Sequence, residues 1–211
     1  IQIKLGEPSP ADKERMKQFK LCQDISDIIT SSEYLNKEYA ESRNWVQDKI
    51  FLSSISEETL KSRLLDLGWS ESDIIRSLLV RTRNFSFFGK DRVTLTIKDH
   101  LSRPIGFITR PIDPIGKLKY INSPESTIYE KGKTLLGIDV AKKYIRKEGV
   151  YIVEGPGDLL QLYRLGIYNA VAVCTNFITA QQLSLLKTLG CTKIFLNFDW
   201  DDAGRIGTQR V

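Results

Sequence analysis

Four carboxylates in the last third of the chain have residue types and spacing that suit metal chemistry. Glu154 follows the apolar run VYIV, and Asp158 comes after it across the turn sequence GPG. Asp199 and Asp201 form a second acidic pair directly after the apolar run KIFLNF. Crowded carboxylates repel one another unless cations lie between them, and Mg²⁺ or Mn²⁺ prefers such all-oxygen ligand sets. The pattern therefore predicts a divalent-metal site.

Each acidic motif has a simpler interpretation when it is taken alone. An acidic residue after a strand is often a helix cap, and Asp158 by itself fits that role better than metal binding. A lone E-x-x-x-D spacing is weak evidence. Its combination with a later D-x-D pair is more specific, because apolar runs typical of strands precede both motifs.

The elements around these carboxylates alternate between short apolar runs and helices from Gly149 onward. The runs VYIV, NAVAV and KIFLNF are typical of buried parallel strands. LLQLYRL predicts a helix that Gly166 ends, and Thr179 is the predicted cap of a helix that Gly190 ends. Functional groups of a parallel sheet collect at the carboxyl ends of its strands, so this fold can bring Glu154 and the D-x-D pair into one crevice.

The earlier part of the chain predicts helices first and antiparallel strands afterwards. Ser56 and Ser70 begin two helical patterns, which Gly68 separates. RVTLTIKD and PIGFITR flank the turn-like HLSR and predict an antiparallel pair. A loop-rich stretch then leads to an apolar spacing from Leu135 to Ile145 that predicts a further helix.

The predicted fold class is α/β, with an α+β amino-terminal part. We expect a helical and antiparallel subdomain over residues 1–115, a connecting basic segment over 116–148, and a parallel-sheet domain flanked by helices over 149–211. The chain opens at IQIKL and stops at GTQRV soon after a new helical pattern begins. We therefore expect a piece of a larger protein.

Charge, cysteine content and the absence of long apolar segments indicate the expected partners and cellular compartment. Lys and Arg number 31 against 26 Asp and Glu, and the resulting net charge of +5 suits a polyanionic partner or simply a basic soluble protein. Cys22, Cys174 and Cys191 include no C-x-x-C pair, so neither a disulfide framework nor a zinc site is indicated in this segment. No long apolar segment or signal peptide is visible, so we expect a cytoplasmic protein without a membrane partner.

Several motifs together resemble one known family. VEGPGD, NAVAV, the T-x-x-Q-x-x-LL helix and FDWDDAGR resemble the Toprim module of topoisomerases and primases. KYINSPES, followed by YEKGKTLLGIDVAKKYIRK, resembles the segment before Toprim in bacterial and phage replicative primases of the DnaG type. PIGFITR resembles the amino-terminal subdomain of that family. The likeness is tightest from Lys117 to Arg205 and faint before Arg81.

The resemblance implies a DNA primase core, a nucleotidyltransferase that makes short RNA primers on single-stranded DNA for replication. Carried over position by position, Glu154 would be the catalytic acid. It would bind two or more Mg²⁺ or Mn²⁺ ions together with Asp158, Asp199 and Asp201. The positions that would meet nucleotide and template are Arg92, Arg110, Lys119, Tyr120, Asn122 and Lys131. Implied partners are single-stranded DNA, ribonucleoside triphosphates and a replicative helicase in the same or another chain, at a replication fork or in a phage-infected cell.

Some basic and aromatic residues also fit structural roles. A solvated surface charge is the simpler interpretation of a lysine outside a motif, and we assign it to Lys142, Lys143 and Lys147. Tyr120 could stack on a base, and packing against its own subdomain is an equal alternative.

The chain also departs from the family. Trp200 lies between the two aspartates where glycine is common, GFITR replaces a small GFGGR-like turn, and Cys174 begins a segment that replaces G-T-A-L-T. No third acidic motif follows the D-x-D pair, and no zinc-binding module precedes the core. We therefore expect an incomplete catalytic core, which need not be active alone.

Two alternatives from other functional classes stay open. A Toprim nuclease or topoisomerase would use the same acids to cleave phosphodiesters, although KYINSPES argues against it. A non-catalytic nucleic-acid-binding module would keep the basic face, while the Trp200 loop would no longer hold metal.

Overall fold

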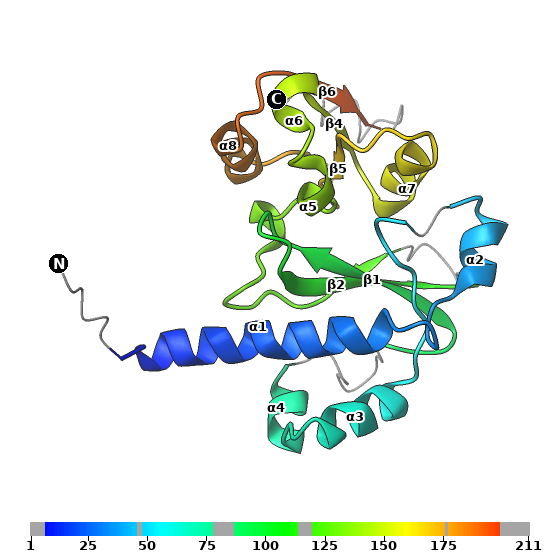
Figure 1. Ribbon diagram of the computed structural model, residues 1–211, viewed down its shortest axis with the longest axis vertical. Coiled ribbons are helices and arrows are strands. Elements are labelled where there is room, and N and C mark those ends of the chain that lie inside the picture. The colour runs from blue at the N-terminus through cyan, green and yellow to red at the C-terminus, as the bar shows by residue number, and fades with distance from the viewer. Residues whose placement is uncertain (1–6, 46–47, 78–86, 114–119, 176, 199–211) are drawn as a thin grey trace.

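The computed structural model describes residues 7–45, 48–77, 87–113, 120–175 and 177–198. Its helices are α1 (Pro10–Ile29), α2 (Lys37–Ser42), α3 (Glu57–Asp66), α4 (Glu71–Arg76), the 3₁₀ turn η1 (Lys131–Lys133), α5 (Ile138–Ala141), α6 (Ile145–Glu148), α7 (Pro156–Arg164) and α8 (Ala180–Thr188). Its strands are β1 (Arg92–Lys98), β2 (Pro104–Pro111), β3 (Ile121–Asn122), β4 (Val150–Val153), β5 (Ala170–Ala172) and β6 (Ile194–Asn197). Figure 1 shows α1 beneath the antiparallel strands, α3 and α4 on the far side of α1, and the parallel strands above. The predicted mixed α/β architecture is confirmed.

Helix α1 packs an apolar stripe between the antiparallel sheet and α3. Leu21, Ile25 and Ile29 recur every four residues and are buried. They share one apolar cluster with Leu64 of α3 and Phe107 of β2. Helix α1 is therefore the layer that joins the small helices to the sheet.

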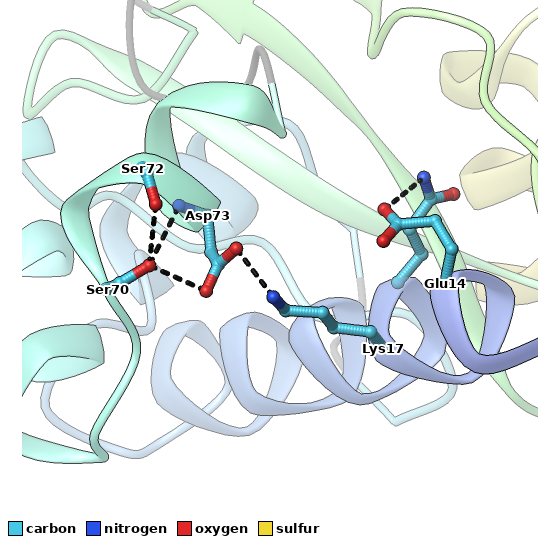
Figure 2. Close-up of polar contacts among 6 residues, drawn as sticks. Glu14, Lys17, Ser70, Ser72 and Asp73 are labelled. Atoms are coloured by element: carbon cyan, nitrogen blue, oxygen red, sulfur yellow. Dashed lines mark hydrogen bonds and ion pairs between the residues drawn. The ribbon is translucent and has the colours of Figure 1, made fainter. Parts of the chain in front are cut away.

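Helices α3 and α4 begin at the predicted caps. The hydroxyl of Ser56 accepts a backbone N–H in the first turn of α3, and Gly68 follows that helix with a left-handed φ of 87°. The hydroxyl of Ser70 accepts the N–H of Asp73 in α4 at 3.2 Å. Figure 2 shows the Asp73 carboxylate also accepting from the Lys17 ammonium of α1, at 2.6 Å. This ion pair ties α4 to α1.

The predicted antiparallel pair is present as β1 and β2, with β3 along the other edge of β2. Val93 of β1 faces Arg110 of β2, and Ile108 of β2 faces Asn122 of β3. The turn between β1 and β2 is closed by the Asp99 carboxylate, which accepts backbone N–H groups of the turn at 2.9 Å. The sheet thus aligns Arg110 and Asn122 on neighbouring strands.

The three predicted apolar runs form the parallel sheet, in the order β5-β4-β6. Tyr151 of β4 pairs with Ala170 of β5 on one side and with Phe195 of β6 on the other. Helix α7 connects β4 to β5 and α8 connects β5 to β6, and the predicted glycines Gly166 and Gly190 end these helices with φ of 77° and 82°. The carboxyl ends of all three strands therefore meet at one edge.

The single helix predicted from Leu135 to Ile145 is wrong. The chain instead forms η1, passes through Leu136, which pairs with Ala172 in an antiparallel bridge, and only then makes the short helices α5 and α6. Gly137 lies between Leu136 and α5 with φ of 85°, and a Cβ there would come within 2.5 Å of a buried tyrosine hydroxyl. Apolar spacing alone did not reveal that Leu136 extends the sheet.

The prediction that Lys142 is only a solvated charge is also wrong. Its ammonium donates to the carbonyl of His100 at 2.7 Å and to the hydroxyl of Ser102 at 3.0 Å, in the turn between β1 and β2. Lys143 and Lys147 are exposed, as expected. Lys142 therefore links α5 to the antiparallel sheet.

The two sheets share one apolar core. Leu95 and Ile108 of the antiparallel sheet lie in the same buried cluster as Val153 of β4, Leu159 of α7 and Ala172 of β5. Among the helices within the described ranges, none is long and apolar enough to cross a membrane. The shared core fixes the antiparallel sheet against the carboxyl ends of the parallel strands, where the predicted site residues gather.

Candidate functional site

A cleft of about 200 Å³ opens where the carboxyl ends of β4 and β5 face β3 and η1. Four of the predicted site residues line it together: Tyr120, Asn122, Lys131 and Glu154. The remaining lining residues are Ile108, Gly155, Pro156, Cys174 and Thr175. The fold therefore brings one acidic, one basic, one aromatic and one amide side chain to a single opening.

Glu154 is placed by the parallel sheet. It directly follows Val153, which pairs with Asn197 near the end of β6. Asp199 and Asp201 follow β6 in the sequence and lie outside the described residues. The register places Glu154 beside the strand that leads into the D-x-D pair, as a convergent acidic site requires.

Asp158 has the capping geometry that its position in the sequence suggested. Its carboxylate accepts the N–H of Gly155 at 3.2 Å, across the first turn of α7. The side chain is at the surface. The helix-cap interpretation is therefore confirmed, and the additional role as a metal ligand stays a prediction.

The donor chemistry of the described residues fits a hard cation only in part. Glu154 offers carboxylate oxygens at the cleft, which suits Mg²⁺ or Mn²⁺. Within the described ranges, no three histidine, cysteine, aspartate or glutamate residues are grouped closely enough to hold a metal ion. Of the other predicted carboxylate ligands, Asp158 caps α7, and Asp199 and Asp201 lie outside those ranges.

Arg110 lies behind the cleft rather than at its wall. The side chain is only 9% exposed, donates through Nη1 to the hydroxyl of Tyr120 at 3.2 Å, and holds its guanidinium carbon 5.1 Å from the centre of the Tyr120 ring. Burial raises the pKa of Tyr120, against the lowering effect of the Arg110 hydrogen bond. Arg110 therefore orients Tyr120, which itself reaches the cleft.

Asn122 and Lys131 enter the cleft from the segment that joins the sheets. The amide oxygen of Asn122 accepts from the hydroxyl of Tyr129 at 3.1 Å, which fixes the amide on β3. Lys131 begins η1, and its backbone N–H donates to the carboxylate of Glu125 at 3.1 Å. Both side chains are partly exposed, so both can meet a ligand.

The remaining predicted nucleic-acid contacts are Arg92 and Lys119. Arg92 begins β1 opposite Pro111 and is not among the lining residues of the cleft. Lys119 lies outside the described residues. Of the ten predicted residues, four line the cleft, and Arg92, Arg110 and Asp158 are described outside its lining. Lys119, Asp199 and Asp201 are not among the described residues.

Sequence reasoning assigned no site role to Cys174 and Thr175, although both line the cleft. Cys174 has a left-handed φ of 55°, which is uncommon for any residue other than glycine. Burial raises the pKa of its thiol to about 12, although Lys131 nearby acts in the opposite direction. The available signal was their position directly after an apolar run, at the carboxyl end of a parallel strand.

Two family models match the parts of the chain that form this cleft. Residues 20–142 match the family described as "DNA primase catalytic core, N-terminal domain". Residues 151–211 match the family described as "Toprim-like". Together the two matches include all ten predicted site residues.

Curated relatives agree with these matches. A DNA primase from Aquifex aeolicus is 45% identical over 115 residues, which are 54% of this chain and 23% of that protein. A DNA primase from Clostridium acetobutylicum is 34% identical over 153 residues, which are 72% of this chain and 25% of that protein. The chain thus spans about a quarter of the length of these relatives.

Solved structures show the same fold. The Aquifex aeolicus primase, with zinc-binding and RNA polymerase domains, has a TM-score of 0.77 and 30% identity, over 99% of this chain and 53% of that one. A DnaG primase catalytic domain bound to single-stranded DNA has a TM-score of 0.78 and 24% identity, over 94% of this chain and 68% of that one.

Proposed function

The chain belongs to the family of DnaG-type DNA primase catalytic cores with a Toprim-like domain, and from this membership we propose that the protein synthesises short RNA primers on single-stranded DNA. One observation carries the proposal. Glu154, Lys131, Tyr120 and Asn122 line one cleft at the carboxyl ends of parallel strands, where this fold class gathers its functional groups.

The proposed reaction joins a 3′-hydroxyl to the α-phosphate of a nucleotide, and pyrophosphate leaves. Glu154 would hold Mg²⁺ or Mn²⁺ with Asp199, Asp201 and Asp158, and bound metal would supply stabilisation of the attacking and leaving oxygens. Glu154 would also take the proton that must leave the attacking hydroxyl, so it is the proposed catalytic acid-base residue.

The remaining side chains of the cleft bind and orient in this proposal. The Lys131 ammonium neutralises phosphate charge in the cleft that it lines together with Glu154. Tyr120, held from behind by Arg110, offers its ring to a base, and the Asn122 amide offers a hydrogen-bond donor to sugar or base. Arg92 and Lys119 are proposed to contact the phosphates of the template as well.

The proposed partners follow from the same chemistry. Single-stranded DNA is the template, ribonucleoside triphosphates are the substrates, and a replicative helicase in the same or another chain delivers the template. The relative that was solved with single-stranded DNA supports the first of these. We further propose that residues 1–115, 116–148 and 149–211 are the structural units of the core, and that it acts in the cytoplasm at replication forks.

Primer synthesis by the full-length protein tests the proposed function. With ribonucleotides, unprimed single-stranded template and Mg²⁺ or Mn²⁺, the wild type should make short RNA. Glu154→Gln keeps the side-chain shape and removes its charge, so it should fold normally and make almost no RNA. If the wild type instead cuts the DNA in a Glu154-dependent way and never joins ribonucleotides, the protein is a Toprim nuclease.

A further inference from the structure

The side-chain amide of Gln182 is fully buried against η1, although Gln182 lies on helix α8. Its Nε2 donates to the carbonyl of Thr134 at 2.7 Å and makes a longer contact of 3.4 Å with the carbonyl of Lys131. Its Oε1 accepts the N–H of Thr179 at 3.0 Å. The amide oxygen of Gln182 is therefore bonded within the cap of α8, and the amide nitrogen is bonded to the segment that carries Lys131.

Thr179 makes the same double connection. Its hydroxyl donates to the carbonyl of Gly132 in η1 and accepts the N–H of Gln182 at 3.1 Å. The two residues thus form the capping box of α8 and, at the same time, bind backbone carbonyls of η1 and of Thr134 directly after it. Capping α8 does not require these outward bonds.

The turn η1 has little stability of its own. It is three residues long, and its N-cap residue Glu130 makes no side-chain capping bond. Such short 3₁₀ turns have poor internal hydrogen-bond geometry, and a short helical segment does not persist in isolation. The position of η1 is therefore set from outside, by Thr179 and Gln182 on one side and by Glu125 on the Lys131 N–H.

Lys131 and Lys133 differ in a way that makes this support relevant to the cleft. Lys133 is exposed and pairs with the carboxylate of Glu130 at 2.8 Å. Lys131 lines the cleft with Glu154, and no carboxylate of a described residue forms an ion pair with its ammonium. Its ammonium is thus available to a ligand, provided that η1 stays where it is.

We propose that Gln182, with Thr179, is a positioning residue that fixes the backbone of η1 so that Lys131 points into the cleft at the phosphates of the incoming nucleotide. The inference rests on the proposed function, because it assigns a role to Lys131 in nucleotide binding. It adds that a buried amide on α8, which does not line the cleft, sets how well Lys131 binds the nucleotide.

Nucleotide kinetics of the full-length protein test the proposal. Gln182→Met keeps the length and apolar packing of the side chain and removes its bonds to the carbonyls of Lys131 and Thr134, together with the capping bond from the N–H of Thr179. Because a displacement of about 1 Å at a reacting group can cost up to roughly 100-fold, we expect KM for ribonucleoside triphosphates to rise by about 10-fold. The matched control is Gln181→Met, on the exposed side of the same helix, which should leave KM unchanged.

A double-mutant cycle distinguishes positioning from a general loss of structure. If Gln182 acts through Lys131, adding Gln182→Met to Lys131→Ala should change KM by less than about twofold, since residues acting as a unit are not additive. A full 10-fold effect in the Lys131→Ala background would overturn the inference, as would a wild-type KM in Lys131→Ala. Wild-type protein that makes no primers at all would instead overturn the proposed function.

Hydrogen exchange provides a readout that is independent of activity. The amides of η1 should exchange faster in Gln182→Met and at the wild-type rate in Gln181→Met. If Gln182→Met does not fold, Thr179→Val replaces it, with Thr179→Ser as the variant that keeps the hydroxyl. Equal exchange of η1 in Thr179→Val and Thr179→Ser would overturn the inference.

Discussion

The backbone N–H of Cys174 donates to the carbonyl oxygen of Glu154 at 2.8 Å. This bond joins the residue after β4 to the loop after β5, immediately beneath the cleft. Cys174 makes it from a left-handed backbone conformation, with φ of 55°. The position of the proposed catalytic carboxylate therefore depends on a strained residue in the next loop.

A β-branched side chain at this position should destabilise the protein. Cys174 already bears the cost of the left-handed region, about 1–2 kcal/mol, and a β-branched residue bears more, so Cys174→Val should lower the free energy of unfolding by the difference, about 1 kcal/mol. Cys174→Gly relieves the strain and loses a small buried side chain, so its net change should stay within about 1 kcal/mol. Urea denaturation measures both. Cys191→Val, at a position without positive φ, is the control, and an equal loss there would contradict the role of strain.

Asp139 should make stability fall as pH rises through the acidic range. Burial raises the pKa of this carboxyl above its ordinary value of 3.8, and the nearby charges of Lys98 and Lys142 act against that shift. The folded state therefore binds more protons than the unfolded state above pH 3.8, and stability decreases until the raised pKa has been passed. Asp139→Asn should remove this slope and raise the melting temperature at pH 7. A variant that melts lower at pH 7 and keeps the slope would contradict the prediction.

Lys131 and Lys133 should differ in their contribution to binding single-stranded DNA. Each phosphate that a lysine neutralises contributes about 0.7 to the slope of log affinity against log salt for a single strand. Lys131→Ala should flatten that slope by about this amount and weaken all sequences alike. Lys133→Ala removes a lysine already paired with Glu130 and should leave the slope unchanged. Fluorescence anisotropy at several salt concentrations gives the slopes, and identical slopes for both variants would remove Lys131 from the interface.

The acidic residues should bind Mn²⁺ as a group. Calorimetric titration of the wild type should show binding, which Glu154→Gln weakens and Asp199→Asn abolishes, because each removes an oxygen ligand with its charge. Glu148→Gln, an exposed change on α6, is the matched control. No binding by the wild type at millimolar Mn²⁺ would favour the non-catalytic binding module.

Local signals predicted most of the fold correctly. Serine and threonine caps, glycines after helices and apolar runs located α3, α4, α7, α8 and the three parallel strands, because each signal acts within a few residues. The prediction of a single helix from Leu135 to Ile145 failed because the structure there depends on a distant partner. Leu136 is extended because it pairs with Ala172, and no local pattern reports a partner 36 positions away.

The sequence predicted those site residues that directly follow a strand. Glu154 could be placed because it follows an apolar run, and family resemblance supplied Tyr120, Asn122 and Lys131, which line the cleft beside it. The support behind them was not predictable. That Arg110 is buried behind Tyr120, and that Gln182 reaches η1, are consequences of packing between elements far apart in the sequence.

The bridge between Leu136 and Ala172 also protects the molecule from its neighbours. Among the described strands, β5 lies at the edge of the parallel sheet, and an open edge is a template on which a second molecule can add a strand. Leu136 occupies that edge with two backbone bonds of 2.9 and 3.0 Å. The residues that follow η1 and reach Leu136 thus also guard against intermolecular β-pairing and aggregation.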